Sequence, residues 1–360
     1  MILNFRLLLQ MFAAESKVVS APASKPLTSE GANSWKQIVE PVEPFLDAVH
    51  ARLALQVNEF DAALTPYAEY ALNGSGKHLR PALVALSANA LGGTNDSHVT
   101  VAVIIEMVHL ATLVHDDIMD GAEMRRARPT LAANWGNEIA VLFGDCLFAQ
   151  ALKLAASFPT PEICRAVAQA TNTVCSGEIL QTQQRRNFHF SRADYFRVLE
   201  MKTAELFALS CELAAVLSGA TLTQRAALRR FGLAFGTAYQ VWDDCVDLFG
   251  TEAAAGKSLG TDLAKGKLTL PILLLWERAT AADRSRLEVL IQDCRNGALS
   301  EVGGLLSKYQ TLAPSLDSVH MYLEMARQAL GELPESRGRE SLLGVTEYLA
   351  LQTNALGIHA

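Results

Sequence analysis

The stretch Val99–Asp120, VTVAVIIEMVHLATLVHDDIMD, decides how the rest of the chain is interpreted. Its first part is strongly apolar, but Glu106 and His109 interrupt it before it reaches the ~18 apolar residues that a transmembrane helix needs. We therefore predict a helix that is buried on most sides and no transmembrane helix. The stretch ends in three aspartates: Asp116, Asp117 and Asp120. Carboxylates at the edge of a core repel one another and lose hydration, so this triplet calls for a cation.

Helical patterning continues through the chain from about Trp35 onward. In 224–242 the apolar residues recur at helical spacing: Leu228, Phe231, Phe235, Ala238 and Trp242. Similar stripes run through 139–156, 163–182, 196–217, 268–278 and 318–330, and Gly and Pro separate them. No run shows the sustained alternation of a strand. The sequence thus predicts an all-α protein, a single large helical bundle around a central cavity, formed by one domain over 35–360.

Composition restricts the class of protein and of partner. Half of the residues are apolar, 19% are charged, and 31 Lys and Arg against 38 Asp and Glu give a net charge of −7. A disordered chain is excluded, and the acidic balance disfavours nucleic acid as a partner. The six cysteines form no C-x-x-C pair and lie in apolar stretches. We expect buried thiols in a reducing compartment, and hence a cytoplasmic protein.

Residues 1–34 differ from the rest of the chain. An apolar start, MILNFRLLLQMFAA, is followed by a connector rich in Ser, Ala and Pro. The charged region and the cleavage pattern of a signal peptide are both weak here. We predict a disordered N-terminal extension, and a targeting or membrane-touching segment remains the alternative.

A second aspartate triplet repeats the spacing of the first. Gln240-Val-Trp-Asp243-Asp244-Cys-Val-Asp247 again follows an apolar helical stretch, and its polar residues share one helix face. Mg²⁺ prefers oxygen ligands and usually binds through one or two carboxylates together with substrate phosphate. One such triplet alone could equally be a solvated acidic turn or a helix N-cap. Two triplets that face each other across a bundle predict a site for several Mg²⁺ ions and one polyanion.

Basic residues accompany the acidic motifs. They occur in five short segments: Gly74–Pro81, Met124-Arg125-Arg126, Lys202-Thr203, Gly256-Lys257-Ser258 and Gly266-Lys267. Each segment alone is weak, since Lys and Arg usually decorate solvated surfaces. Beside metal-binding carboxylates they suit the recognition of phosphate oxygens.

Taken together, these motifs resemble the trans-isoprenyl diphosphate synthases, or polyprenyl synthetases, and most of all the bacterial long-chain, octaprenyl-type enzymes. The resemblance is dense over about 70–275 and includes Gly144-Asp145, Gly177-Glu178-x-x-Gln181, Lys202-Thr203-Ala204 and the Asp262 to Pro271 segment. It implies the isoprenoid synthase type I fold. It also implies a prenyltransferase that joins an allylic diphosphate head-to-tail, in trans, to isopentenyl diphosphate and releases pyrophosphate.

The resemblance also implies a role for each matching residue. Three Mg²⁺ ions per active site would be bound by Asp116, Asp117, Asp120, Asp243, Asp244 and Asp247. Catalysis would rest on Asp116, Asp117, Asp120, Asp243 and Asp244 together with Lys202. The allylic diphosphate would be held by Arg125, Lys202, Thr203, Gln240, Lys257 and Lys267. The diphosphate of isopentenyl diphosphate would be held by Lys77, Arg80, His109 and Arg126. A homodimer is implied as well, with peripheral membrane contact through the product.

Product length should depend on what blocks the cavity beneath Asp116. Residues four and five positions earlier lie about one turn, or ~6–7 Å, deeper, and they are the small Thr112 and Ala111. Val108 follows on the next turn, and the helix carries no aromatic residue. Short-chain members of the family usually have a bulky aromatic near the first of these positions. We therefore expect a product longer than C20 and take Ala111, Thr112 and Val108 as the chain-length pocket.

Three other functions compete with this interpretation. A short-chain farnesyl or geranylgeranyl diphosphate synthase would share every catalytic motif. A class I terpene cyclase would share the first acidic motif but normally has a different second metal motif. A non-catalytic subunit of a heteromeric synthase would be expected to lose one acidic motif, and both are intact.

Overall fold

The structure, a computed structural model, describes residues 35–73, 78–125, 128–251, 259–293 and 298–359. The predicted extension over 1–34 lies outside the described residues. In the first half the helices are α2 (Trp35–Val39), α3 (Glu43–Gln56), α4 (Thr65–Leu72), α5 (Leu79–Asn89), α6 (Asp96–Met119), α7 (Leu131–Trp135), α8 (Asn137–Ala156) and α9 (Glu162–Gln183), with 3-10 turns η2 (Glu40–Val42), η3 (Val57–Glu59) and η4 (Ala62–Leu64).

The second half of the chain is also helical. Its elements are α10 (Arg192–Leu199), the π-helical turn η5 (Glu200–Ala204), α11 (Glu205–Leu217), α12 (Leu222–Phe249), α14 (Thr261–Ala264), α15 (Leu270–Arg278), α16 (Ala281–Asp293), α17 (Ala298–Lys308), α18 (Leu312–Leu330) and α19 (Arg337–His359). The all-α prediction is confirmed apart from a small antiparallel hairpin of β1 (Met124–Arg125) and β2 (Arg128–Pro129). Two-residue strands are too short to leave an alternating pattern in the sequence.

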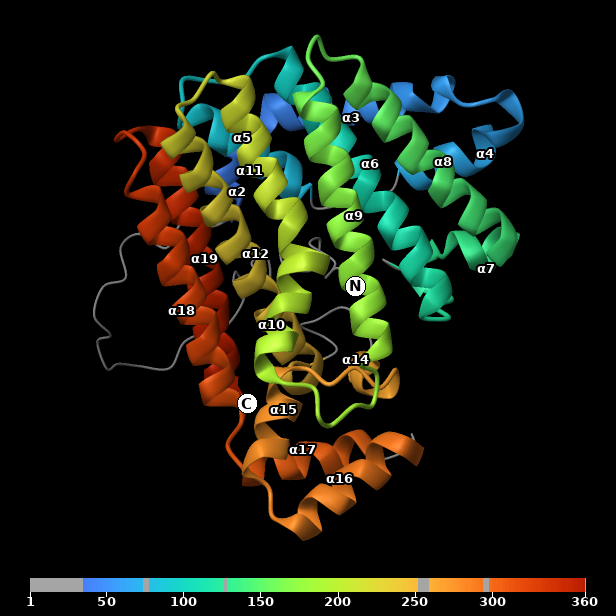
Figure 1. Cartoon of the computed structure of the whole chain (residues 1–360), viewed down its shortest axis with the longest axis vertical. Helices are drawn as coiled ribbons and strands as arrows, with labels where there is room; N and C mark the ends of the chain where they lie inside the picture. Colours follow the sequence, from blue (N-terminus) through green and yellow to red (C-terminus); the bar gives the residue numbers. More distant parts are fainter. Residues whose placement is uncertain (1–34, 74–77, 126–127, 252–258, 294–297, 360) are drawn as a thin grey trace, which may run out of the picture.

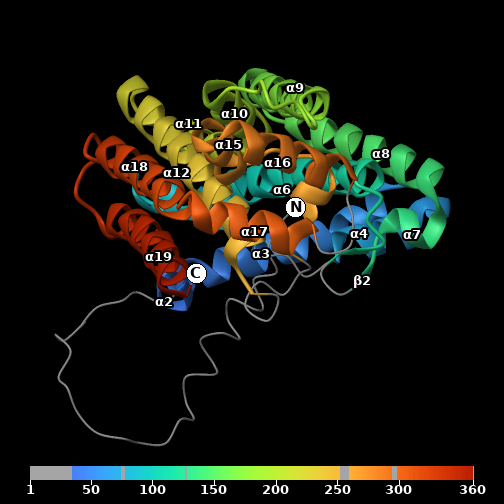
Figure 2. The ribbon, with the colours of Figure 1, turned by 90° about the horizontal axis from the view of Figure 1, so that it is seen from below.

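Long helices run side by side through the body of the molecule (Figure 1). The helix α12 packs against α11 and α18, and α6 packs against α5, α8 and α11. Seen from below, α6 lies in the middle, with α9 and α10 on one side and α3 and α4 on the other (Figure 2). The shorter helices α15, α16 and α17 extend from one end of the bundle (Figure 1).

The helix α6 forms the centre of the core, as its apolar sequence predicts. It begins at a capping box in which Asn95 and His98 bond to each other's backbone. His98 also contacts the Ala214 carbonyl and the Ser218 hydroxyl at 3.2 Å each, which ties α6 to the end of α11. The most apolar part of α6 is 78% buried inside the protein. Each fully buried Val, Ile or Leu there contributes about 1.5–3 kcal/mol of stability.

The helix α12 carries the second aspartate triplet to the same end of the bundle. Thr221 and Gln224 form a capping box at its start, and Gly250 ends it. Its apolar stripe is buried, including Phe231, Phe235 and Trp242. Because α6 and α12 are both long and both anchored at their far ends, their aspartates are held in fixed positions.

The cysteines follow the prediction only in part. Cys211 and Cys245 are buried, but Cys175 is exposed, so the expectation of a buried thiol is wrong at that position. Cys175 lies on α9 and faces a groove between α6, α8 and α9. Cys294 lies outside the described residues.

Candidate active site

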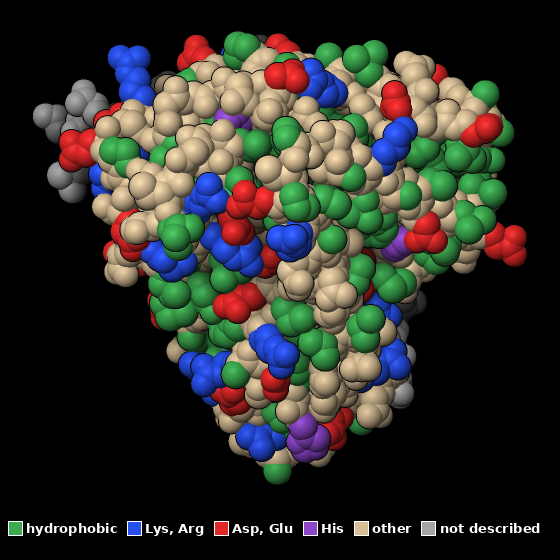
Figure 3. All heavy atoms as spheres, turned by 45° about the horizontal axis from the view of Figure 1, so that its top comes forward, with side chains coloured by type: hydrophobic (Ala, Val, Ile, Leu, Met, Phe, Trp, Pro, Cys, Tyr) green, Lys and Arg blue, Asp and Glu red, His purple; other side chains and the backbone are tan. Residues whose placement is uncertain are grey.

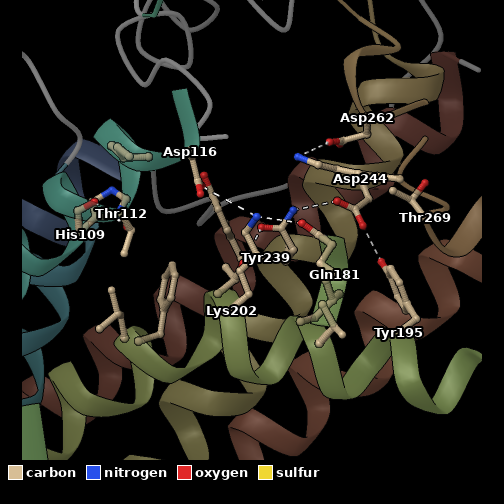
Figure 4. Close-up of a pocket in the computed structure, with 18 of the residues that line it drawn as sticks. His109, Thr112, Asp116, Gln181, Tyr195, Lys202, Tyr239, Asp244, Asp262 and Thr269 are labelled. Carbon is tan, nitrogen blue, oxygen red and sulfur yellow. Dashed lines mark hydrogen bonds and ion pairs between the residues drawn. The ribbon is translucent and has the colours of Figure 1, made fainter. Parts of the chain in front are cut away.

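A cavity lies between the C-terminal half of α6, the turn η5 and the C-terminal half of α12, and residues of α5, α9, α10, α11 and 262–269 also line it. Figure 4 shows His109 and Asp116 on one wall, Asp244 and Tyr195 on the other, and Lys202 between them. Predicted polar residues that line it are Thr112, Asp116, Asp120, Thr203, Gln240 and Asp244. Predicted basic residues that line it are Arg80, His109, Lys202 and Lys267. Segments far apart in the sequence thus meet here.

The three aspartates of α6 have three different environments. The Asp116 carboxylate faces the cavity, 3.9 Å from the Lys202 Nζ. Asp117 points away from it and pairs with the Arg125 Nε at 2.7 Å, beside the β1–β2 hairpin. Asp120, at the end of the helix, faces the cavity again. The D-D-x-x-D spacing therefore places only its first and last members on the cavity wall.

Asp120 is the centre of an ion-pair network. Its carboxylate lies 3.1 Å from the Nζ atoms of both Lys265 and Lys267 and 3.3 Å from the Arg185 guanidinium. Burial alone would raise the pKa of Asp120, but the charges of Lys267 and Lys265 outweigh it and lower that pKa to about 2. For Asp117 the balance is opposite, since burial raises its pKa although Arg125 opposes the shift.

The aspartates of α12 are all buried. Asp244 accepts hydrogen bonds from the Tyr195 hydroxyl at 2.6 Å and from the Gln240 Nε2 at 2.8 Å. Burial, strengthened by the Asp262 carboxylate, holds the pKa of Asp244 well above its ordinary value. Asp247 accepts from the Thr261 hydroxyl and the Asp262 backbone N–H at 3.2 Å each, so it fastens the segment after α12.

The donor set fits a divalent cation. Among the residues that the structure describes, no three or more His, Cys, Asp or Glu side chains lie close enough to bind one ion as they stand. The carboxylates are instead paired with Lys and Arg or hydrogen bonded. However, Asp243 and Asp244 are buried, and the Oδ2 atom of buried Asp262 has no hydrogen-bond partner among the described residues. Buried carboxylates are ligands that Mg²⁺ prefers, and the diphosphate of a substrate would supply the remaining ones.

The Lys202 ammonium lies in the middle of the cavity (Figure 4). It donates to the Gln181 Oε1 at 2.8 Å and forms a close ion pair with Glu178. Burial alone would lower the pKa of Lys202, but the Asp116 and Glu178 carboxylates raise it, so the side chain is charged. The neighbouring Thr203 donates to the Gln240 Oε1 at 3.1 Å.

Two further basic groups lie deeper on the α5 and α6 side. The Arg80 guanidinium is buried and lies over the Phe207 ring, 4.6 Å from its centroid, which fixes its plane. His109 is buried on α6 and also lines the cavity. Arg125 pairs with Asp117 outside this cavity, and its assigned role stays a prediction. Three predicted residues, Lys77, Arg126 and Lys257, lie outside the described residues.

Several side chains at the cavity were not among the predicted site residues. Tyr195 and Arg185 lie in unremarkable sequence, and Lys265 is an unassigned position of the Asp262 to Pro271 segment; only the fold brings these three to the aspartates. Glu178, Gln181 and Asp262 stand in motifs that the sequence analysis quoted without assigning them a role.

The predicted chain-length residues divide into two groups. Thr112 lines the cavity and also a second one between α6, α8 and α9, which shares Asp116 and Lys202 with the first. This second cavity is lined mainly by apolar side chains, among them Phe148 and Val174. Ala111 and Val108 are instead buried against the core.

Comparison with known proteins agrees with the geometry. The family model of polyprenyl synthetase matches residues 61–305. The chain is 32% identical to the octaprenyl diphosphate synthase of Haemophilus influenzae over 89% of this chain and 98% of that one. The crystal structure of a decaprenyl diphosphate synthase from Rhodobacter capsulatus matches with a TM-score of 0.83 at 30% identity, over 88% of this chain and 99% of that one.

A second solved structure is equally similar. The polyprenyl synthase from Caulobacter crescentus, in complex with calcium and isoprenyl diphosphate, matches with a TM-score of 0.83 at 31% identity, over 89% of this chain and 98% of that one. The helical bundle, the facing aspartates and these similarities lead to one assignment: the chain belongs to the polyprenyl synthetase family of prenyltransferases.

Proposed function

We propose that this protein is a Mg²⁺-dependent polyprenyl diphosphate synthase that joins an allylic diphosphate to isopentenyl diphosphate, head-to-tail and in trans, and forms a long-chain product. The observation that carries the proposal is that aspartates of α6 and α12 line one cavity together with buried Lys and Arg side chains. Carboxylates on opposing walls suit metal ions that bridge protein and diphosphate, and the basic groups suit the remaining phosphate oxygens.

The six aspartates divide by their distance from the cavity. Asp116, Asp120 and Asp244 line it, and we assign these three to direct contact with up to three Mg²⁺ ions. When bound, Mg²⁺ acts as a Lewis acid that stabilises the negative charge of the departing pyrophosphate. Asp117 and Asp247 would act indirectly, by fixing Arg125 and the 259–262 segment, and buried Asp243 stays a predicted metal ligand.

The protein's own groups bind and orient the two substrates. Lys202 and Lys267 lie beside the cavity-facing aspartates and would hold the allylic diphosphate, whereas Arg80 and His109 would hold isopentenyl diphosphate. The C–O bond of the allylic diphosphate breaks, and the double bond of isopentenyl diphosphate forms a C–C bond to the cation that remains. Alignment of the two carbons lowers the barrier, and apolar walls such as Phe207 exclude water. The proton then leaves to pyrophosphate, so no protein base is required.

A long-chain product fits the space beneath Asp116. Thr112, Asp116 and Lys202 line both the diphosphate cavity and the apolar cavity between α6, α8 and α9, and α6 contains no Phe, Tyr or Trp. Relatives of this chain are named octaprenyl and decaprenyl diphosphate synthases. A short-chain product, C15 or C20, is the alternative.

The same face of the molecule supports a homodimer. Only 39% of the most apolar part of α8 is buried, although its composition would suit a membrane-crossing or core helix. Leu142 and Val141 of α8 are exposed, as are Met119 of α6 and Ile179 of α9. Figure 3 shows hydrophobic side chains gathered on the right, the side on which Figure 1 places α8. We assign this face to a second copy of the chain, which would also cover the apolar cavity, because Met119, Val141 and Ile179 line that cavity. Leu142→Glu should yield a monomer by light scattering, and an unchanged mass would contradict the assignment.

One assay tests the proposed reaction. Purified protein is incubated with Mg²⁺, labelled isopentenyl diphosphate and farnesyl diphosphate, and the products are sized by chromatography. We expect elongation beyond C20 that stops when EDTA removes Mg²⁺. Cyclised hydrocarbon without uptake of isopentenyl diphosphate would point to a terpene cyclase. No elongation from any allylic primer would refute the proposal, and a ladder ending at C15 or C20 would refute its long-chain part.

A further inference from the structure

The motif Gly177-Glu178-x-x-Gln181 on α9 has no role in the reaction as proposed so far. All three of its defined residues contact one other residue, Lys202 of the π-helical turn η5. Two of these contacts are made to the side chain and one to the backbone. The motif therefore determines the surroundings of Lys202 on the α9 side.

The first contact is made by the carboxylate and amide of the motif. Glu178 and Gln181 are three residues apart and therefore share one face of α9. Glu178 forms a close ion pair with the Lys202 ammonium, and the Gln181 Oε1 accepts a hydrogen bond from it at 2.8 Å. The Asp116 carboxylate, at 3.9 Å, is more distant. The ammonium is thus held from the α9 side, and its third N–H is left for the cavity.

The second contact is made by the glycine. A Cβ atom on Gly177 would lie 2.7 Å from the Lys202 backbone nitrogen and 2.9 Å from the Met201 Cβ, both closer than real Cβ contacts. From the opposite side, a Cβ on Gly236 of α12 would lie 2.7 Å from the Ala204 Cα. The helices α9 and α12 therefore both pack against η5 at positions where only glycine fits.

This packing explains why a π-helical turn persists at 200–204. Single π-turns are rare, have poorer hydrogen-bond geometry than α-helix, and occur frequently at functional sites. Here Lys202 and Thr203 belong to the π-helical turn and line the cavity. The glycines at 177 and 236 give the turn room, and Glu178 with Gln181 fixes the direction of the side chain that it presents.

We propose that Gly177, Glu178 and Gln181 are positioning residues that hold the Lys202 ammonium in the place where it meets the allylic diphosphate. This inference rests on the proposed function. Without the α9 contacts, the flexible lysine would be free to move closer to Asp116, whose Oδ2 lies 3.9 Å from its Nζ. It would then be withdrawn from the substrate, and an aspartate of the metal site would be withdrawn with it.

The test compares Glu178→Ala in the natural chain with the same change in a Lys202→Ala background. In the natural chain we expect the KM for the allylic diphosphate to rise about 10- to 100-fold, the range for a lost hydrogen bond to a charged group, with little change in the KM for isopentenyl diphosphate. In the Lys202→Ala background, Glu178→Ala should change the same parameter by less than about twofold, because nothing remains to be positioned. Gln181→Ala should behave in the same way, with a smaller effect.

A matched control and a second readout separate this inference from its alternatives. Glu162→Ala removes another carboxylate of α9, one that pairs with Arg225 on the surface at 3.0 Å, and should leave both KM values unchanged. Binding of inorganic pyrophosphate with Mg²⁺, measured by calorimetry, should weaken in Glu178→Ala only where Lys202 is present. If the natural chain binds pyrophosphate but elongates no primer, the proposed function fails and the binding data still decide the positioning role. Equal loss in both backgrounds, or equal rises in both KM values, would overturn the inference.

Discussion

Replacing Tyr195 by phenylalanine would remove one hydroxyl and leave the buried ring in place. That hydroxyl is one of two donors to the Asp244 carboxylate, at 2.6 Å, and the Gln240 amide is the other. Burial already holds the pKa of Asp244 well above its ordinary value, and the Tyr195 hydrogen bond opposes that shift. In Tyr195→Phe the carboxylate should therefore be harder to ionise. Since Mg²⁺ requires the ionised form, the affinity of the site for the metal should fall.

The size of the effect follows from the lost bond. A hydrogen bond to a charged group contributes about 1.5–3 kcal/mol, which corresponds to about 10- to 100-fold in an equilibrium constant. Loss of a group that orients a metal ligand generally costs a similar factor in metal affinity. We expect the Mg²⁺ concentration for half-maximal rate to rise by at least about tenfold at pH 7. The difference in Mg²⁺ dependence between the variant and the natural chain should be smaller at pH 8.5. Because the pKa of Asp244 is raised, a higher pH favours the ionised carboxylate that binds the metal.

The chain offers a matched control for this experiment. The Tyr309 hydroxyl donates to the Asp283 Oδ2 at 2.5 Å, which is the same kind of bond, but it joins α16 to the end of α17 far from the cavity. Tyr309→Phe should leave the Mg²⁺ dependence of the rate unchanged. The assay is the rate of label incorporation at saturating substrates, titrated with Mg²⁺. A Tyr195→Phe curve that coincides with that of Tyr309→Phe would refute the reasoning.

Two more predictions concern product length and stability. Thr112→Phe should place a ring where the two cavities meet and shorten the product in a sizing assay. Ala111→Phe should instead overpack the core and lower stability by about 1–3 kcal/mol. A full-length product from Thr112→Phe would contradict a product path past Thr112. Arg229 donates to buried Glu205 at 2.8 and 3.0 Å, so Arg229→Ala should cost about 3–5 kcal/mol at pH 8 by leaving a buried charge unpaired. Burial raises the pKa of Glu205 although Arg229 opposes the shift. Protonation of Glu205 at pH 5 should therefore reduce the stability loss of Arg229→Ala. Thermal unfolding of both proteins at pH 8 and pH 5 measures that change.

The helices were predictable because their apolar residues repeat with the helical period. The stripe in 224–242 lies inside α12, and the stripes in 139–156 and 163–182 lie inside α8 and α9. The stripe in 196–217 was predicted as one helix, yet η5 interrupts it at 200–204. That interruption depends on close packing by Gly177 and Gly236, and neither residue lies within the interrupted segment.

The candidate site was predictable in its types of residue but less so in their orientation. Spacing alone placed the two acidic motifs on helices at the edge of the core. The spacing could not predict that the Asp117 carboxylate pairs with Arg125. Both residue types are equally expected at a site that binds a substrate diphosphate. Tyr195 was missed since a tyrosine in an amphipathic helix is typical of a core residue, and its partner Asp244 lies 49 positions away along the chain.

The cations around Asp120 have a consequence for how the two ligands arrive. Mg²⁺ alone would have to displace Lys265 and Lys267 from Asp120, which would weaken the charge pairing of both ammonium groups although Asp262 lies 3.8 Å from Lys267. A diphosphate alone would attract the same lysines and leave the Asp120 carboxylate with Arg185 but without its two lysine partners. When both come together, Asp120 would bind the metal and Lys265 and Lys267 would bind the diphosphate, so that each charge would have a counterion. The free protein is thus arranged for a simultaneous exchange of partners, so metal and substrate should strengthen each other's binding reciprocally.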